Sequence, residues 1–301
     1  MRYLVIGGTG LIGTRLVEHL IAAEDEVFVL TRSSSSVLPK GAHRVRWDGK
    51  TTAGWADLVE KMDGIINLAG ENLGASRWTE ERKKAIIESR SFASQAVVSA
   101  IQNAVHKPEV LIQSSAVGYY GTLSPAALDE KDLPGSDFLA NICVDWEKVT
   151  EPVELLGVRH IVIRSGVVLA AEGGALSRML LPFRFFVGGP LGSGKQWLSW
   201  IHLEDEVRAI VFLLKQDTLS GVFNLTSPKP VTNAGFGKTL ARILHMPYWL
   251  PVPAFALKLL LGEMSTMVLD GQCVLPERLQ LAGFQFEFPE LDVALRNILK
   301  K

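Results

Sequence analysis

The sequence predicts an α/β protein of the Rossmann type, with a doubly wound parallel sheet and a smaller, mainly helical C-terminal substrate lobe. Three observations support this fold class. Short apolar runs alternate with helical segments through the first half of the chain, which is the pattern of βαβ units. A glycine-rich turn follows the first apolar run, and beyond Gly173 the chain becomes rich in glycine and aromatic residues.

The expected strands are short and apolar, as strands buried on both faces should be. Helical spacing of apolar residues is found over 11–24. A long helix is expected over 79–104, because Thr79 can cap it and two glutamates follow at the positive end of the helix dipole. The expected strands lie at 3–7, 26–32, 63–70, within 108–121, and at 159–169.

The expected division is a dinucleotide-binding domain over residues 1–170, which also receives later segments such as 195–228, and a smaller lobe over 171–301. No flexible linker separates the two, so we expect them to be interleaved. The apolar stretch 248–262 is interrupted by two prolines and a lysine. It is too short to span a bilayer, and it predicts a buried or lid-like helix with a kinked entry.

Composition excludes several classes of partner. The 301 residues include 48% hydrophobic residues, enough for a sizeable core, and 31 basic against 32 acidic residues. This balance argues against a nucleic-acid or membrane partner. The two cysteines form no CxxC or Cys/His cluster, so neither a disulfide framework nor a metal site is expected. With no targeting segment at the N-terminus, a cytoplasmic location is expected, and the oligomeric state stays open.

The glycine turn has the spacing of a dinucleotide site. Gly7, Gly10 and Gly13 lie between the first strand and the first helix, the context that this motif requires. Gly7 permits the tight turn, Gly10 lets a pyrophosphate approach the backbone, and Gly13 lets helix and strand pack closely. The expected cofactor site also includes Thr9, Leu11 and Ile12.

The end of the second strand indicates which dinucleotide is bound. A carboxylate there would bind the ribose 2′-hydroxyl of NAD, but Thr31 and Arg32 are found instead, followed by serines. A guanidinium with neighbouring hydroxyls suits a 2′-phosphate. NADP(H) is therefore favoured over NAD(H). The alternative is that Arg32 is simply a solvent-exposed side chain.

Further motifs extend over essentially the whole chain. They are "NLAGENL" (67–73), "RWTEERKKAIIESR" (77–90), "SAVGYYG" (115–121), "RSGVVL" (164–169), "GGALSRMLLPF" (173–183), "GGPLGSGKQWLSWIHLED" (188–205) and "LPERLQLAGFQFEFPELDVAL" (275–295). With them, the sequence resembles the atypical, epimerase-like branch of the extended short-chain dehydrogenase/reductase superfamily. The resemblance implies an NADP(H)-binding oxidoreductase that acts on a small organic substrate, with sugars among the candidates.

The resemblance also implies further cofactor contacts. Thr31 and Arg32 match the 2′-phosphate end of the family's site, and Arg90 matches a cofactor-contacting arginine. Val168 matches a residue beside the nicotinamide half. An apolar core position would explain Val168 equally well, as it would Leu68 and Ala69, and Arg90 could be a solvated helix residue. The segment matched to the adenosine and pyrophosphate side comprises Leu68, Ala69 and Gly70.

The residues of the usual reaction are missing. The superfamily uses a tyrosine as general acid/base and a lysine four residues later that lowers its pKa. None of the four tyrosines here has a lysine at that spacing, and Leu139 and Cys143 occupy the matching positions. Ala116 stands at the usual serine position, one residue from Ser115. The standard hydride mechanism is therefore not predicted.

Other polar residues are the candidates to replace this couple. Tyr119 and His202 could transfer protons, although the tyrosine could also pack the cleft wall and the histidine could be structural. Two functions stay open: an epimerase-like enzyme, or a non-catalytic NADP(H)-binding redox sensor or interaction protein. The catalytic candidates are Ser115, Tyr119 and His202, and the substrate-binding candidates are Glu71, Arg77, Tyr120, Lys195, Gln196 and Trp200.

Overall fold

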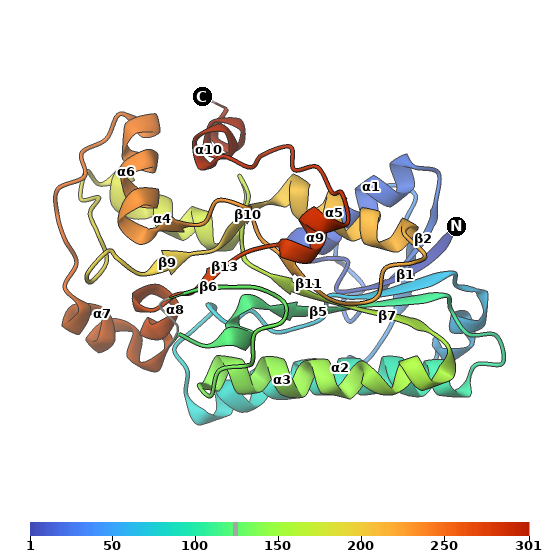
Figure 1. The fold of residues 1–301 in the computed structure, drawn as a ribbon. Coiled ribbons are helices and arrows are strands. Elements are labelled where there is room, and N and C mark those ends of the chain that lie inside the picture. The colour runs from blue at the N-terminus through green and yellow to red at the C-terminus, as the bar shows by residue number, and fades with distance from the viewer. Residues whose placement is uncertain (123–125, 301) are drawn as a thin grey trace.

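A seven-stranded parallel sheet forms the centre of the molecule in the computed structural model, which describes residues 1–122 and 126–300 (Figure 1). The strand order is β11-β7-β5-β4-β1-β2-β3, so the chain reverses its direction of travel across the sheet between β1 and β4. Ligands of such sheets bind at this reversal, outside the carboxyl ends of the strands. The strands are β1 (Arg2–Ile6), β2 (Glu26–Thr31), β3 (His43–Arg46), β4 (Gly64–Asn67), β5 (Val110–Ala116), β7 (Arg159–Ser165) and β11 (Gly221–Leu225).

Helices cover both faces of the sheet (Figure 1). The helices α2 (Glu80–Asn103) and α3 (Phe138–Thr150) lie on one face, and α1 (Leu11–Ala22) and α5 (Leu203–Lys215) lie on the other. Strand β1 shows why both faces are filled, because successive side chains point to opposite sides. Tyr3 and Val5 enter the apolar cluster under α1 and α5, whereas Leu4 and Ile6 enter the cluster that includes α2 residues. The predicted Rossmann-type fold is confirmed.

The long helix begins where the sequence predicts. The Thr79 side chain accepts a hydrogen bond from the Arg82 backbone N–H at 3.2 Å, which caps α2. The single strand expected over 159–169 is wrong in detail. It divides at Gly166 into β7 and β8 (Val167–Leu169), and β8 pairs with β10 (Trp200–His202) outside the central sheet. A Cβ at Gly166 would lie 2.6 Å from the Ser199 carbonyl oxygen, so the close approach of these segments requires glycine there.

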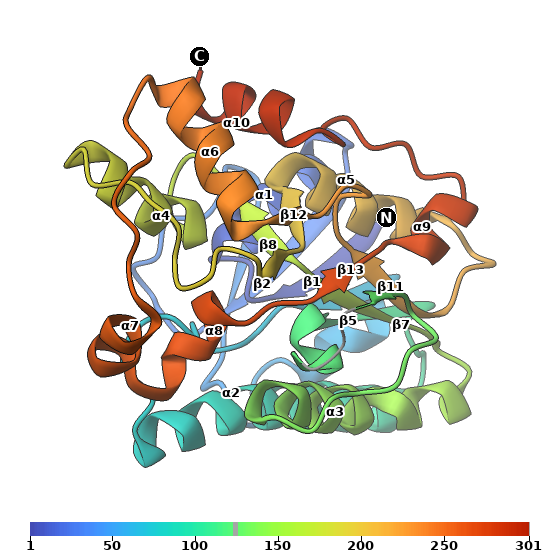
Figure 2. The ribbon, with the colours of Figure 1, turned by 60° about the vertical axis from the view of Figure 1, so that its left-hand side comes forward.

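The later part of the chain adds a smaller group of helices at one end of the sheet (Figure 2). Its apolar cluster includes Phe183, Trp200 and Phe236. The remaining elements are α4 (Gly174–Arg184), α6 (Asn233–Leu244), α7 (Ala254–Leu261), α8 (Thr266–Leu269), α9 (Glu277–Leu281), α10 (Leu291–Leu299), β6 (Ala127–Leu128), β9 (Trp197–Leu198), β12 (Val231–Thr232), β13 (Cys273–Val274), and the 3-10 helices η1 (Ala56–Lys61), η2 (Val117–Tyr120), η3 (Glu151–Leu156) and η4 (Gly262–Ser265).

Of the two alternatives for 248–262, the buried helix is wrong, and the lid-like helix stays a prediction. Helix α7 begins after Pro253, but only Leu257 of its residues is buried. Phe255 and Leu259 are 74% and 78% exposed, because this almost wholly apolar helix packs only one side against the protein. None of the helices in the two described ranges is long and apolar enough to cross a membrane.

Candidate functional site

The glycine turn between β1 and α1 uses each glycine for a different reason. Gly7 has φ +81°, and a Cβ there would lie 2.8 Å from the Leu68 carbonyl carbon, so the turn passes tightly against the end of β4. A Cβ at Gly13 would lie 2.2 Å from the Gly7 oxygen, which explains the close packing of α1 on the turn. Gly10 is exposed, and its Cβ would meet only the Gly7 oxygen, at 3.3 Å. This position leaves the backbone open to a ligand.

The first turn of α1 fits an anion. Gly10 is its N-cap, and no side chain among the described residues caps it. Uncapped amide groups and the positive end of the helix dipole point to the space above the turn. A cavity of about 300 Å³ lies there, at the carboxyl ends of β1, β2 and β4. This cavity, the turn cavity, is lined by Gly7, Thr9, Gly10, Leu30, Thr31, Arg32, Ser33, Trp47, Gly49, Leu68, Ala69, Gly70, Glu71, Ser89 and Ala93.

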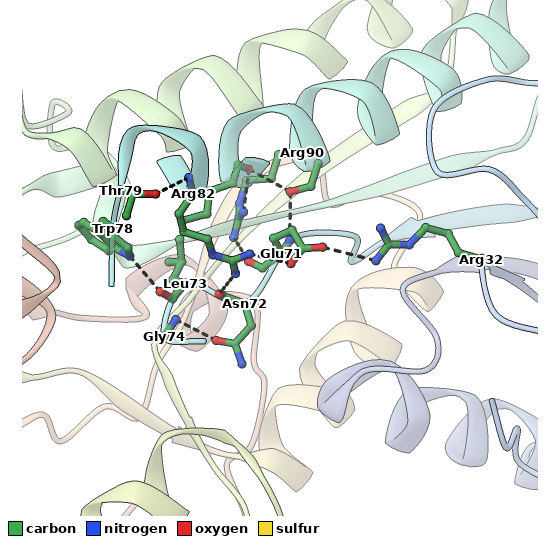
Figure 3. Close-up of polar contacts among 11 residues, drawn as sticks. Arg32, Glu71, Asn72, Leu73, Gly74, Trp78, Thr79, Arg82 and Arg90 are labelled. Atoms are coloured by element: carbon green, nitrogen blue, oxygen red, sulfur yellow. Dashed lines mark hydrogen bonds and ion pairs between the residues drawn. The ribbon is translucent and has the colours of Figure 1, made fainter. Parts of the chain in front are cut away.

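Three charged side chains meet at the rim of the turn cavity (Figure 3). Glu71 Oε1 lies 3.5 Å from Arg32 Nη2, and Glu71 Oε2 lies 3.2 Å from Arg82 Nη1. The Arg32 side chain is 69% exposed and its contact is long, so the ion pair is weak. The guanidinium can therefore turn to a phosphate group. Glu71 lines the turn cavity, so its expected contact with substrate stays a prediction.

Arg90 is a buried cation without an acidic partner among the described residues. It is 8% exposed, and its guanidinium donates to the Ile86 carbonyl oxygen at 3.0 Å and to the Glu71 carbonyl oxygen at 3.2 Å. It also lies over the Trp146 ring, 4.8 Å from the centroid. Burial lowers the pKa of Arg90. The alternative of a solvated helix arginine is wrong, and a buried positive charge fits an anionic ligand.

A second cavity, of about 200 Å³, lies at the ends of β5 and β7 beside α3. Arg90 lines this strand-end cavity, and its guanidinium also packs against Gly70 of the turn cavity. Leu139 and Cys143 form part of the wall, at the positions that match the tyrosine and lysine of the superfamily. Burial raises the pKa of the Cys143 thiol to about 11, so the thiol is neutral. Apolar side chains therefore occupy the place of the usual acid/base couple.

Ser115 belongs to a buried network on the α3 side of the sheet. Its hydroxyl donates to Glu147 Oε1 at 2.5 Å. Arg164 donates to both oxygens of the same carboxylate, at 2.9 and 2.8 Å. The Arg164 guanidinium lies over the Tyr119 ring, 3.3 Å from the centroid. Ser115 is 3% exposed, and the network occupies its hydroxyl, which does not support the expected catalytic role.

Tyr120 was expected to contact substrate, and its position corrects that expectation. The side chain is buried, and its hydroxyl donates to Asn224 Oδ1 at 2.8 Å and accepts from Arg164 Nη1 at 3.0 Å. Burial raises the pKa of Tyr120 to about 12. Its partner Tyr119 is half-buried and packs edge-on against it.

His202 and Trp200 are structural residues in the part of the chain that the structure describes. His202 caps α5, because its Nδ1 accepts from the Glu204 backbone N–H at 3.0 Å, and its ring stacks on Phe288. Burial lowers the pKa of His202. Trp200 has no exposed surface, and its Nε1 donates to the Lys229 carbonyl oxygen. Both expectations are therefore corrected, since neither side chain lines the cavities at the sheet edge.

The other expected residues are scattered. Arg77 is exposed beside Gly262, and Lys195 is exposed in its loop. Gln196 lines a smaller cavity of about 80 Å³ next to the strand-end cavity, but its amide nitrogen already donates to two backbone carbonyl oxygens. Val168 packs against the apolar cluster under α1, which agrees with the core alternative.

Several residues of the two cavities escaped the sequence analysis. Trp47 and Gly49 follow β3, next to β2 in the sheet, and line the turn cavity. A Cβ at Gly49 would lie 2.9 Å from Arg32 Cδ, so this glycine gives the arginine room to pack. In the sequence, these two residues could have been found as an aromatic residue and a glycine just after a strand, in "RWDGK". Ser165 and Gly166, at the end of β7 and directly after it, line the strand-end cavity in the same way.

Comparison with known proteins agrees with this architecture. The model of the NAD dependent epimerase/dehydratase family matches residues 3–141, and a model of a domain of unknown function matches residues 252–298. An "epimerase family protein" of Staphylococcus saprophyticus is 43% identical over 300 residues, with 99% of both chains covered. One from Staphylococcus aureus is 41% identical over 303 residues, covering 100% of this chain and 99% of that one.

Solved structures extend the comparison. The human epimerase family protein SDR39U1, crystallised with NADPH, is 35% identical, with a TM-score of 0.88 and 100% of both chains covered. The nucleoside-diphosphate sugar epimerase of Corynebacterium glutamicum is 28% identical, with a TM-score of 0.80, covering 99% of this chain and 58% of that one. UDP-glucose 4-epimerase of Thermus thermophilus, at 18% identity, 100% and 98% coverage and a TM-score of 0.81, shares the fold.

Proposed function

The chain belongs to the NAD dependent epimerase/dehydratase family, and on that premise we propose that it is an NADP(H)-dependent oxidoreductase acting on a small carbonyl or alcohol substrate. The observation that carries the proposal is the arrangement of two cavities along the carboxyl edge of the sheet. The turn cavity has a cation at its rim, the strand-end cavity is mostly apolar, and Arg90 lies between them.

The choice of NADP(H) rests on the end of β2. Thr31 and Arg32 stand where a carboxylate would bind the 2′-hydroxyl of NAD. Glu71, which follows β4, lies between Arg32 and Arg82, and these arginines pair its charge. Glu71 is therefore not a free carboxylate for the 2′-hydroxyl of NAD. The human relative crystallised with NADPH, 35% identical over the whole chain, supports the same choice.

The residues present fit such a cofactor. Arg32 would hold the 2′-phosphate, and the amides at the start of α1 together with Arg90 would hold the diphosphate. When bound, the nicotinamide would supply or accept a hydride. The apolar wall formed by Leu139 and Cys143 would exclude water from the substrate.

The proposal is tested by titrating the protein with NADPH in a calorimeter. NADPH oxidation is then followed across a panel of small ketones, aldehydes and nucleotide sugars. We expect saturable binding, and turnover with at least one carbonyl class. Absence of NADPH binding would contradict the proposal.

One observation favours a second function. Leu139 and Cys143 cannot act as the superfamily's acid/base couple, which suits a protein that binds NADP(H) to sense it. In that case NADPH binds, no member of the panel is reduced, and mutation of other cleft residues changes only the affinity.

A further inference from the structure

Glu206 of α5 is a buried acid with no cation beside it among the residues that the structure describes. The residue has no exposed surface. Its Oε1 lies 2.5 Å from Ser165 Oγ, while its Oε2 is buried without a hydrogen-bond partner among the described residues. An ionised carboxylate in such a place is costly unless it is paired, so the neutral acid is favoured.

The charged groups nearby are engaged elsewhere. On α1, Arg15 and His19 approach Glu204 at 3.0 and 2.6 Å. On α5 itself, Arg208 pairs with Asp205 at 3.0 Å, and the Asp205 carboxylate also accepts from the backbone N–H groups of Glu287 and Phe288. None of these cations compensates Glu206.

Within residues 1–122 and 126–300, the other elements packed on α5 add no compensating charge. His202 precedes the helix and uses its Nδ1 as the cap. Arg164 is on β7, one residue before Ser165, so its side chain points to the opposite face of the sheet, where it pairs with Glu147. Burial accordingly raises the pKa of Glu206 to about 8, and the carboxyl holds its proton at neutral pH.

Ser165 connects this proton to the strand-end cavity. It is the last residue of β7 and lines the cavity, as do Leu139 and Cys143 of α3. The Ser165 hydroxyl donates to Glu206 Oε1 at 2.5 Å. When the protonated carboxyl donates to Ser165 instead, the serine hydroxyl is free to turn to the cavity.

We propose that Glu206 and Ser165 form a proton relay that replaces the missing tyrosine and lysine, and this inference rests on the proposed function. A carbonyl in the cavity is reduced to an alcohol when its carbon receives the hydride of the cofactor, which is oxidised, and its oxygen receives the Ser165 hydroxyl proton. Ser165 regains a proton from Glu206. After the alcohol leaves the cavity, a solvent proton returns to the carboxylate through the Ser165 hydroxyl, so each reduction consumes one NADPH and one proton. Alcohol oxidation runs the same transfers in reverse.

Three variants test the relay. Glu206→Gln keeps the shape of the side chain but cannot supply the proton, and Ser165→Ala removes the connecting hydroxyl. Ser114→Ala is the matched control, because Ser114 lies on neighbouring β5, opposite Ile163 in the register, and lines none of the three cavities described above. NADPH titration of each variant shows whether the cofactor site is intact.

The first readout is infrared spectroscopy, which needs no turnover. We expect the carbonyl stretch of a protonated carboxyl at pH 7, lost in Glu206→Gln, shifted in Ser165→Ala and unchanged in Ser114→Ala. Cyclohexanone added with NADP⁺ should have its carbonyl stretch lowered by the wild type but not by Ser165→Ala. A Glu206 that is ionised at pH 7, or a ketone band equal in the two proteins, overturns the relay.

The second readout is the pH profile of NADPH-dependent reduction. Wild-type kcat should fall as the pH rises through about 8, the pKa of Glu206. Glu206→Gln should lower kcat by a factor on the order of 10² to 10⁴ and remove this fall. A wild-type rate and profile in Glu206→Gln overturns the relay. If the wild type does not bind NADPH, the proposed function is overturned instead. The infrared band of the protonated Glu206 carboxyl would still be present, because it requires no cofactor.

Discussion

Two serine–glutamate pairs lie at the ends of neighbouring strands, on opposite faces of the sheet. Ser115 of β5 meets Glu147 of α3, and Ser165 of β7 meets Glu206 of α5, each at 2.5 Å. Arg164 binds both oxygens of Glu147, whereas Glu206 has no cation beside it in the described structure. On the α3 face, the serine–glutamate pair is part of an ionised network of Ser115, Glu147 and Arg164, which we call the brace. On the α5 face, the same kind of pair contains a neutral acid.

The brace and the acid differ in what they connect. The brace extends from Arg164 to Tyr120 and Asn224, and so ties β5, α3, β7 and β11 together. Ser115 is enclosed by the brace and lines neither the turn cavity nor the strand-end cavity. Ser165 lines the strand-end cavity. A buried carboxyl is available for chemistry only where its structural surroundings leave its proton exchangeable.

The largest expected effect comes from removing the cation of the brace. Arg164→Met leaves Glu147 buried without its partner, and we expect the free energy of unfolding to fall by about 3–5 kcal/mol. Urea denaturation at pH 7 measures this change. The control is Arg242→Met, whose pair with Asp292 is exposed and should contribute less than about 1 kcal/mol. Equal losses in the two variants would show that the brace is not an ionised pair.

The second-largest expected effect is a pH dependence of the free energy of unfolding that comes from the neutral Glu206. The pKa of Glu206 is raised from 4.5 to about 8 in the folded protein. Its stabilising contribution is therefore complete below pH 4.5 and is lost as the pH rises to about 8, because the unfolded chain ionises first. Within this window, wild type should lose about 1.4 kcal/mol per pH unit relative to Glu206→Gln. Urea denaturation from pH 5 to 8 measures the difference, and a constant difference would refute the neutral acid.

A smaller effect is expected at the edge of the brace. Tyr120→Phe removes the hydroxyl between Asn224 and Arg164, and we expect a loss of about 1–2 kcal/mol in unfolding free energy. Tyr119→Phe is the control, since it retains the ring that Arg164 covers, and it should change stability by less than about 0.5 kcal/mol. NADPH affinity should be unchanged in both. Weaker NADPH binding in Tyr120→Phe would place that hydroxyl in the cofactor site instead.

The sequence predicted the features that depend on local geometry. Each of the three glycines has a separate expected role, because a turn, a close approach and a packed helix each exclude a Cβ at a fixed spacing. The structure gives Gly7 and Gly13 those surroundings and leaves Gly10 open, so the approach of a ligand to Gly10 stays a prediction. The cap at Thr79 was predictable for the same reason, since its partner is three residues away.

The sequence could not predict contacts made across the fold. Ser165 and Glu206 are 41 residues apart, and only the packing of α5 on β7 brings them together. Tyr120, Trp200 and His202 have side chains that suit a site near strand ends, but side-chain direction decides whether such a residue faces the cavity or the core. Their buried positions result from packing partners that the local sequence does not reveal.

The central claim, that the turn cavity binds a phosphorylated dinucleotide, is tested most directly by dissociation constants of NADPH and NADH for wild type and Arg32→Ala. We predict that the variant weakens NADPH binding about 10- to 150-fold, the equivalent of a charge-assisted contact of about 1.5–3 kcal/mol, with little change for NADH. Arg46→Ala, which removes an exposed arginine of β3 outside the cavity lining, should leave both constants unchanged. Equal losses for the two cofactors in Arg32→Ala, or no binding of either by wild type, would contradict the account.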